Sequence, residues 1–479
     1  MRGGHAQPSG SPPVDKGSGG LKSEAGAQVK GGHPEPSVSP PVNRGASPRG
    51  VALAALGRVE QEGAWANLLL PGLLARSGLA PGDRAAVTDL VNGSLRLRGA
   101  LDAALAPLSR QPLGRLQPLV RNGLRLGAYE LLFAGTAPHA ALSEVVGAVR
   151  RAGNQGQAGY VNAVLRRLAD SPPRWPDRDG DPVAWATTAG SHPPWIVAEA
   201  LDRLGAEGLV RLVEADNARP AVTLRATPGA ATRDQLLAEL AAAGVEATPS
   251  GLSRDCVVLA RGDPGELAAV REGRAVVQDA AAALVAPALG AREGDLVVDL
   301  AAGPGGKAGH LAALGARVLA VELHPGRARL VRETAVRLGQ TARLLAVAGD
   351  ATRLPLADGS CDGALVDAPC SNLGSLRRRP EARWRHRADE VPGLAALQRR
   401  LLAAAARAVR PGGAVLYAVC TWTRAETDEV VDAVLADHPE LEPAPLAGPV
   451  GPGPRRQLWP HLDGGDGMFL ARFVRRGGP

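Results

Sequence analysis

Residues 297–310 read VVDLAAGPGGKAGH, and this stretch decides how the second half of the chain folds. Val297–Leu300 is a short apolar run typical of a buried strand, and a helical pattern resumes after His310. The glycines between them let the backbone approach a ligand closely, and the following helix offers unpaired N–H groups. A strand, a glycine-rich turn and a helix form the opening unit of a nucleotide-type site. The loop lacks the GxxxxGK[ST] pattern of a P-loop and fits the looser GxGxxA form of the dinucleotide fingerprint.

Acidic residues follow the next two predicted strands. Val318–Val321 ends at Glu322, where a carboxylate can accept hydrogen bonds from ribose hydroxyls. Leu344–Val347 is followed by Asp350, which is placed to meet an adenine edge. Together the two acids favour a ligand that contains adenosine, although a nicotinamide cofactor would need the same parts.

Two of the four cysteines follow the two strands after these. Gly363–Val366 leads into DAPCSNLG (367–374), and Ala414–Ala418 leads into VCTW (419–422). Because ligands of an open α/β sheet lie beyond the carboxyl ends of its strands, we expect Asp367, Cys370 and Cys420 to converge on one crevice. One reaction that two thiols and a carboxyl group fit is methylation of cytosine at C5. A thiolate that adds to C6 of the cytosine makes C5 able to attack an electrophilic methyl group. A carboxyl group can stabilise the ring, and a base must then remove the C5 proton.

Composition narrows the class of protein. The 479 residues carry a formal charge of +7, which favours a polyanionic partner. Four cysteines without zinc-ligand spacing predict neither a disulfide framework nor a metal site and suit a reducing cytoplasm. The chain shows neither the apolar core of a signal peptide nor an apolar run long enough to span a membrane. Lys307 is the only lysine outside the N-terminal tail, which suggests that its position needs a compact ammonium group.

The chain divides by composition into several segments. The tail is rich in Gly, Pro and Ser and holds a degenerate duplication, GGHAQPSGSPPVDKG from Gly3 and GGHPEPSVSPPVNRG from Gly31, and we expect it to be disordered. The next segment has helical periodicity and 14 Arg against 8 acidic residues, which predicts a basic all-α domain. The predicted segments are a tail (1–48), an all-α domain (49–170), a linker (171–190), a helical and small α+β unit (191–275) and a Rossmann-like α/β domain (276–479).

Several motifs carry a resemblance to a known family. They are LRLGAYELL (124–132), APHAALSEVV (137–146), YVNAVLRRL (160–168), HPPW (192–195), VQDAAAAL (277–284), RRRPEARW (377–384) and DGMFLARF (466–473). With the loop and the two cysteines, they make the chain resemble the bacterial 16S ribosomal RNA cytosine-C5 methyltransferases of the RsmB (Sun, Fmu) type. The resemblance covers almost everything after the tail. It implies a NusB-like RNA-binding domain, a small α+β RNA-binding subdomain and a methyltransferase domain.

The resemblance also implies roles for particular residues. Cys420 would attack C6, Cys370 would assist product release, and Asp367 would contact the cytosine and the reactive end of the cofactor. S-adenosylmethionine would be held, without a metal, by Ala301, Ala302, Gly303, Pro304, Gly305, Gly306, Lys307, Glu322, Asp350 and Asp367. The partner would be small-subunit ribosomal RNA, and we expect a monomer. The family loop usually reads CAAPGGKT and its nucleophile usually follows Thr, whereas this chain has Ala301, Gly303, Ala308 and Val419 at the differing positions.

Two further expectations concern RNA contact. Arg225 is a possible contact in the small α+β unit. The dense basic segment beside Cys370, which contains Arg377, Arg378, Arg379, Arg383, Arg385 and Arg387, is expected to contact phosphates.

Alternatives remain on sequence grounds. A cytosine in transfer RNA would keep the reaction and change the substrate. A non-catalytic NusB-type RNA-binding factor would keep the fold, although retention of Lys307, Asp367, Cys370 and Cys420 argues against it. A DNA cytosine methyltransferase fits less well, because its nucleophile is the Pro-Cys thiol and it lacks a helical module.

Overall fold

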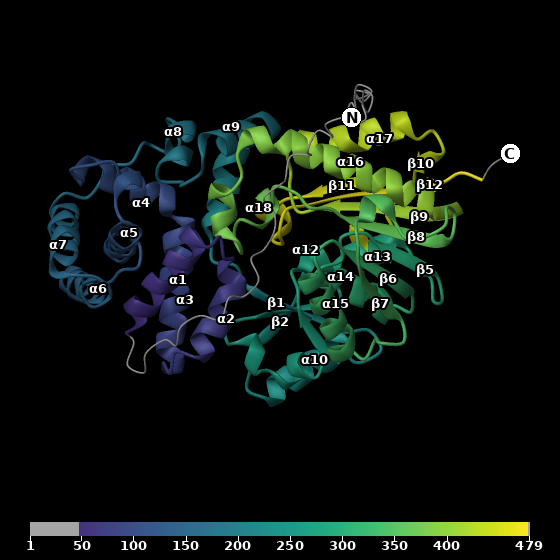
Figure 1. Ribbon diagram of the computed structural model, residues 1–479, viewed down its shortest axis with the longest axis horizontal. Helices are drawn as coiled ribbons and strands as arrows, with labels where there is room; N and C mark the ends of the chain where they lie inside the picture. Colours follow the sequence, from purple (N-terminus) through teal and green to yellow (C-terminus); the bar gives the residue numbers. More distant parts are fainter. Residues whose placement is uncertain (1–46, 478–479) are drawn as a thin grey trace, which may run out of the picture. The chain divides into compact units, whose positions relative to one another are not determined.

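A computed structural model describes residues 47–477, from the first helix to the last strand (Figure 1). The duplicated tail therefore lies outside the described residues, except for its last two positions. Ser47 caps the first helix by accepting a hydrogen bond from Gly50 N (3.3 Å), so the helical domain begins at Pro48, slightly before the predicted boundary. None of the helices within residues 47–477 is long and apolar enough to cross a bilayer.

The N-terminal domain is all-α, as predicted. Apolar side chains at three- and four-residue spacing, such as Val51, Ala55 and Val59 on the first helix, pack into one shared core. Its helices are α1 (Pro48–Gln61), α2 (Ala66–Ala75), α3 (Pro81–Arg96), α4 (Arg98–Leu105), α5 (Pro118–Leu132), α6 (Pro138–Ala152) and α7 (Gln155–Asp170).

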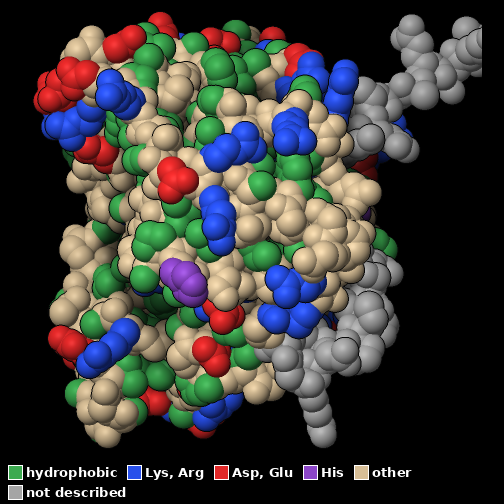
Figure 2. All heavy atoms as spheres, turned by 90° about the vertical axis from the view of Figure 1, so that its left-hand side faces the viewer, with side chains coloured by type: hydrophobic (Ala, Val, Ile, Leu, Met, Phe, Trp, Pro, Cys, Tyr) green, Lys and Arg blue, Asp and Glu red, His purple; other side chains and the backbone are tan. Residues whose placement is uncertain are grey.

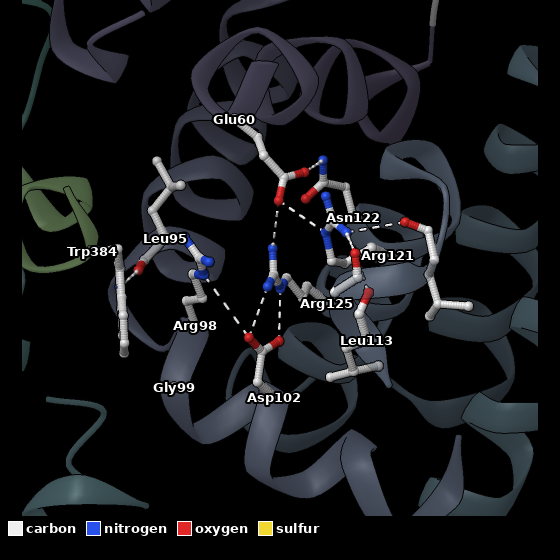
Figure 3. A network of polar contacts seen from close by, with 12 residues as sticks. Glu60, Leu95, Arg98, Gly99, Asp102, Leu113, Arg121, Asn122, Arg125 and Trp384 are labelled. Carbon is white, nitrogen blue, oxygen red and sulfur yellow. Dashed lines mark hydrogen bonds and ion pairs between the residues drawn. The ribbon is translucent and has the colours of Figure 1, made fainter. Parts of the chain in front are cut away.

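A charged network ties three of these helices together (Figure 3). Arg125 on α5 donates to both oxygens of Asp102 on α4, at 2.7 Å each, and reaches Glu60 on α1 at 3.3 Å. Glu60 also accepts from Arg121 (2.9 Å) and Asn122 (3.0 Å). Burial disfavours the charge on Arg125, but Asp102 and Glu60 outweigh it and raise the pKa of the guanidinium. This bidentate geometry makes Arg125 a structural arginine of the helical domain.

A small α+β unit follows. The predicted linker is not wholly irregular, since it contains α8 (Pro182–Thr187). The sequence pattern also predicts two helices here, around 195–204 and 208–216, and α9 (Pro194–Asn217) consists of two helical stretches that meet at Gly205, whose φ of 68° is non-helical and favours glycine. The sheet is antiparallel in the order β2-β3-β1-β4. The strands and helices of this unit after α9 are β1 (Val222–Ala226), α10 (Arg233–Ala242), β2 (Ala247–Pro249), β3 (Cys256–Leu259), α11 (Ala268–Arg271) and β4 (Ala275–Val277).

The C-terminal domain is built on a mixed sheet in the order β10-β12-β9-β8-β5-β6-β7, with β11 paired to β12. Strands β5 to β9 are parallel, as predicted for a Rossmann-like fold, whereas β10, β11 and β12 pair antiparallel. The strands are β5 (Leu296–Asp299), β6 (Arg317–Glu322), β7 (Leu344–Ala348), β8 (Cys361–Asp367), β9 (Val409–Val419), β10 (Leu441–Pro443), β11 (Arg455–Leu458) and β12 (Met468–Arg475).

Alternating side chains along these strands supply two core layers. Leu365 and Leu416 point to the face covered by the helices that lead into and follow β5 and β6, whereas Val366 and Tyr417 point to the opposite face (Figure 1). The helices are α12 (Ala280–Ala283), α13 (Val285–Leu289), α14 (Gly306–Ala313) and α15 (Pro325–Arg337) with the first layer, and α16 (Val391–Ala408) and α17 (Asp428–Asp437) with the second. Because β6 and β8 flank β5, the chain reverses direction across the sheet beside β5, where ligands bind in such folds.

Candidate active site

The carboxyl ends of β5, β6, β8 and β9 meet at one edge of the sheet. The register pairs Asp299 with Leu365 and Asp367 with Ala418, so the residues after β5, β8 and β9 are neighbours. This brings the glycine-rich loop, Asp367 and both cysteine turns together, which is the convergence that the sequence predicts.

Two thiols form the centre of the site. Cys370 Sγ and Cys420 Sγ lie 3.4 Å apart, although 50 residues separate them in the chain. Cys370 is buried, whereas Cys420 is partly exposed. The hydrogen bond from Cys370, aided by the Arg379 and Lys307 charges, lowers the pKa of Cys420 below its ordinary value. The same hydrogen bond and burial raise the pKa of Cys370 well above its ordinary value. The pair therefore contains one thiol that ionises readily and one that stays neutral.

Asn372 links the two cysteine turns, and the sequence analysis missed it. Its Oδ1 lies 3.2 Å from Cys420 Sγ, and its Nδ2 donates to Cys370 O at 2.8 Å. The backbone of Asn372 adopts a left-handed conformation (φ 59°), which this residue type tolerates better than most. The sequence feature that could have pointed to Asn372 is its place, as a polar residue two positions after the Pro369-Cys370 pair.

An ion pair borders the thiols. Lys307 Nζ, on the first turn of α14, lies 2.6 Å from Asp367 Oδ2 at the end of β8. Burial disfavours the ammonium charge, but Asp367 outweighs that penalty and raises the pKa of Lys307. Lys307, the one lysine among residues 47–477, is thus a charged group placed between the cofactor loop and Cys420.

Asp299 is a second acidic residue that the sequence analysis did not single out. It ends β5, is fully buried, and its Oδ2 has no hydrogen-bond partner among the described residues. Burial, reinforced by the charge of Asp367 and opposed by Lys307, raises the pKa of Asp299 to about 7. In the sequence, Asp299 could have been recognised as an acidic residue at the end of an apolar predicted strand.

The glycine-rich loop closes onto Glu322. Gly303 N donates to Glu322 Oε2 at 3.0 Å, and Arg327 Nη2, which the sequence analysis missed, donates to Gly303 O at 2.7 Å. A Cβ at Gly303 would lie 2.4 Å from Glu322 Oε2, so the Ala that the family usually has here would require the Glu322 carboxylate to shift. Gly305 precedes α14 with a φ of 103°, and Gly306 opens the helix. The loop is a close-fitting cradle that ends at a helix N-terminus, which suits an adenosyl ligand.

The remaining predicted cofactor residues lie nearby. Gly349 N donates to Glu322 O at 3.0 Å, so Asp350 follows β7 beside the end of β6. Asp350 Oδ1 accepts hydrogen bonds from Thr352 N and Oγ1, and the bond from Thr352 N is the largest cause lowering the pKa of Asp350. Leu323, directly after Glu322, is 61% exposed and offers an apolar surface at the same edge, which the sequence analysis missed.

The predicted RNA contact through Arg383 is wrong. This side chain is fully buried, and burial lowers its pKa to about 10. Its guanidinium donates to Arg96 O (3.0 Å), Ser191 O (3.1 Å), Asn217 Oδ1 (2.9 Å) and Asp216 O (3.3 Å). These acceptors belong to the helical domain and to the segment around α9. Arg383 therefore joins three parts of the chain and is not available to a phosphate.

Most other arginines of that segment also satisfy acceptors within the protein. The neighbouring Trp384 also contacts the helical domain, since its Nε1 donates to Leu95 O on α3 at 3.2 Å (Figure 3). Arg387 differs, because it is exposed and pairs with Asp389 at 3.0 Å. The internal contacts are Arg377 with the carbonyls of Gly464 and Gly465, Arg378 with Asp279 and Asp466, Arg379 over the Trp65 ring, and Arg385 with Ala64 O and the Trp65 ring. Arg379, Arg383 and Arg385 thus hold this segment against the helical domain. Arg377 and Arg378 contact distant residues of the C-terminal domain itself.

Arg225 is likewise not an RNA contact. It is fully buried and donates to Gln278 Oε1 (2.6 Å) and Ala226 O (3.1 Å). Burial lowers its pKa to about 10. Its role in the described structure is to join the small sheet to the segment before α12.

No group of three or more His, Cys, Asp or Glu residues within 47–477 has the arrangement of a metal site.

Sequence comparisons match each part of the chain. The model of the 16S rRNA methyltransferase RsmB/F family matches residues 286–474, that of the NusB family matches 46–170, and that of the RsmF/B-like ferredoxin-like domain matches 192–264. A putative methyltransferase of Mycobacterium tuberculosis (strain H37Rv) is 43% identical over 449 residues, covering 89% of this chain and 96% of the relative. A probable ribosomal RNA small subunit methyltransferase B of Bacillus subtilis is 34% identical, covering 90% and 99%.

Solved structures share the fold. The crystal structure of PH0851 superposes with a TM-score of 0.79 at 24% identity, covering 89% of this chain and 99% of its own. The structure of NSun6 from Pyrococcus horikoshii gives a TM-score of 0.52 at 19% identity, covering 60% and 99%.

Proposed function

Because the chain belongs to the RsmB/F family of small-subunit ribosomal RNA methyltransferases, we propose that it methylates carbon 5 of a cytosine in that RNA, with Cys420 as nucleophile. The observation that carries this proposal is the pair of thiols 3.4 Å apart, at the ends of neighbouring strands and beside the Lys307–Asp367 ion pair. Two adjacent thiols whose pKa values shift in opposite directions suit a division of addition and release between them.

The geometry supports a division of labour between the thiols. Cys420 is partly exposed and has the lowered pKa, so its thiolate is available to add to C6 of the cytosine. The Lys307 ammonium balances the negative charge of this thiolate. Cys370 is buried and neutral and lies in contact with Cys420. It is placed to give its proton to the Cys420 sulfur as the C6–S bond breaks, and the Cys370 thiolate that remains takes the C5 proton as the methylated base leaves.

Asp367 and Asn372 border the place where the base must lie. Asp367 is partly exposed beside Lys307, and we propose that it holds the N3 and N4 edge of the cytosine as charge moves onto the ring. The amide of Asn372 holds Cys420 toward the same space. The target cytosine must be unstacked to reach this edge of the sheet.

The cofactor is S-adenosylmethionine, which supplies an electrophilic methyl group when bound. We propose that Ala301 to Lys307 hold it, together with Glu322, Asp350 and Asp367. The Gly303–Glu322 contact supports this assignment, since it places a buried carboxylate against a loop without side-chain bulk.

The helical domain is the proposed RNA-docking surface. Figure 2 shows several separate basic side chains, interspersed with acidic ones, over the end of the molecule that this domain forms. The exposed arginines of the domain include Arg110, Arg115, Arg150, Arg151, Arg166 and Arg167. Such a distribution suits sequence-independent contact with phosphates.

The test is methylation of small-subunit ribosomal RNA with methyl-labelled S-adenosylmethionine. Wild type is expected to give labelled 5-methylcytosine and Cys420→Ala none. Cys370→Ala is expected to accumulate a denaturation-resistant protein–RNA adduct, because release is blocked after addition. Cys361→Ala is the matched control, since this buried cysteine starts β8 at the opposite end of the strand and should leave methylation unchanged.

Other outcomes would redirect or refute the proposal. An adduct through Cys370 in the Cys420 variant would exchange the two roles. Label in transfer RNA alone would change the substrate and keep the mechanism. Absence of label from both RNAs, together with absence of cofactor binding, would favour a non-catalytic NusB-type RNA-binding factor.

A further inference from the structure

A buried carboxylate lies behind the two cysteine turns. Glu426 closes the short helix η8 (Arg424–Glu426) and is fully inaccessible to solvent. Its Oε1 accepts hydrogen bonds from Ser371 N (2.9 Å) and Gln398 Nε2 (3.1 Å). Its Oε2 accepts from the hydroxyls of Ser371 (2.5 Å), Thr423 (3.0 Å) and Thr421 (3.3 Å). A buried carboxylate is costly unless it is hydrogen-bonded, and here five donors meet it.

The positions of the donors matter more than their number. Ser371 directly follows Cys370, and Thr421 directly follows Cys420. One carboxylate therefore holds the residue after each thiol. The two hydroxyls also bond to each other at 2.7 Å, which closes the link between the turns. The separation of the two sulfurs depends on this shared anchor.

A second layer fixes the carboxylate itself. Gln398 on α16 donates to Pro369 O at 2.9 Å, so the backbone is held on both sides of Cys370. The Tyr417 hydroxyl on β9 lies 2.7 Å from Glu426 O and 3.0 Å from Gln398 Oε1, so its one hydrogen is shared between two acceptors of this network. A buried polar network with all members satisfied is rigid, whereas a partly satisfied one is a weak point.

We propose that Glu426 is a positioning residue that keeps Cys370 and Cys420 in register for covalent addition and release. Glu426 lies behind the thiols and does not touch the substrate, so it acts through Ser371 and Thr421. The inference rests on the proposed function for its kinetic consequences, but its geometric consequence, a fixed contact between two thiols, does not depend on RNA.

The test is Glu426→Gln. The amide nitrogen would replace the oxygen that accepts from the hydroxyls of Ser371, Thr421 and Thr423. These hydroxyls would have to reorient and accept from it, which rearranges the hydrogen bonds that join the two turns. A displacement of about 1 Å in a reacting group typically costs on the order of 100-fold in rate. We therefore expect kcat to fall about 10- to 100-fold, with KM for RNA and for S-adenosylmethionine within about twofold of wild type.

A second readout needs no RNA. The rate of Cys420 alkylation by iodoacetamide follows its thiolate fraction, which the contact with Cys370 increases. If the turns separate in Glu426→Gln, the midpoint of the alkylation profile should move upward by on the order of one pH unit. A merely structural role would lower the unfolding temperature and leave this midpoint in place.

Glu130→Gln is the matched control. Glu130 is equally buried and accepts from Arg49 (2.6 Å), but it lies on α5 of the helical domain. It should lose stability while keeping the wild-type kcat and alkylation midpoint. If Glu426→Gln does not fold, Thr421→Val removes one donor, keeps the carboxylate, and should shift both readouts in the same direction by a smaller amount.

Wild-type kcat and an unshifted alkylation midpoint in the folded variants would overturn the proposal. If wild type makes no 5-methylcytosine but Glu426→Gln still shifts the midpoint, the proposed function fails and the positioning role stands. The two failures are thus distinguishable.

Discussion

Replacing Asp299 with asparagine is expected to make stability less dependent on pH. Asp299 ends β5 in a fully buried position, and its Oδ2 lacks a partner among the described residues. Ala301 N approaches Oδ1 only at 3.5 Å. Burial, reinforced by the charge of Asp367, raises the pKa of Asp299 to about 7 in the folded state. In the unfolded chain an aspartic acid titrates near about 3.9.

The sign follows from proton counting. Between pH 4 and pH 7, roughly, the folded protein binds a proton at Asp299 that the unfolded chain has lost, so the free energy of unfolding falls as pH rises. A difference of about three pKa units corresponds to about 4 kcal/mol, and the loss is complete above about pH 7. Asparagine cannot ionise and keeps nearly the same shape, so the variant escapes this loss.

The assay is urea denaturation of wild type and Asp299→Asn at several pH values. The two proteins should be about equally stable near pH 4, and the variant should be more stable by about 4 kcal/mol near pH 8. Taking the difference between the two proteins removes the contribution of every titrating group that does not interact with Asp299. A difference that stays constant across this range would refute the reasoning, because it would mean that Asp299 titrates alike in both states.

Three further changes test other contacts. Gly305→Ala should weaken S-adenosylmethionine binding about tenfold in calorimetry, since its φ of 103° disfavours alanine and its Cβ would lie 3.1 Å from the Val331 backbone. Arg383→Met should lower the free energy of unfolding by about 4 kcal/mol, about 1 kcal/mol for each of the four acceptors left unpaired. Asp367→Asn should lower the pKa of Lys307, because burial disfavours the ammonium charge and the carboxylate that compensates for it is removed. The pKa is measured by NMR of methyl-labelled lysine.

Each of these variants has a comparison. Gly57→Ala lies in open space on α1 and should not change cofactor affinity. Arg387→Met removes only an exposed ion pair and should alter stability by less than about 0.5 kcal/mol. A stability loss at Arg383 no larger than at Arg387, or an unchanged Lys307 titration in Asp367→Asn, would contradict the contacts described.

The sequence was informative where physical pattern and position coincide. The parallel strands β5 to β9 were visible as short apolar runs separated by turns and helices, and Asp367, Cys370 and Cys420 follow from the rule that sites lie at strand ends. The antiparallel strands β10 to β12 were not expected, because their pairing is set by contacts between distant segments and not by local pattern.

Charge density was the misleading signal. Residues 377–387 look like a solvated basic face, and nothing in their spacing says that Arg383 meets backbone carbonyls of distant segments. Carbonyl acceptors have no side-chain signature, so their partner cannot be read from composition. Glu426 escaped attention for a related reason, since its donors come from two turns that only the folded sheet brings together.

The contacts of Arg383 and Trp384 also determine when, during translation, the helical domain can pack against the C-terminal domain. Trp384 lies 289 residues after Leu95, whose carbonyl it binds. At a translation rate of roughly 5–20 residues per second, that carbonyl is made about 15 to 60 s before its partner. The helical domain therefore completes its own core while the edge formed by Leu95 and Arg96 is still bonded to water. The hydrogen bond between Trp384 and Leu95 can form only after residue 384 has left the ribosome.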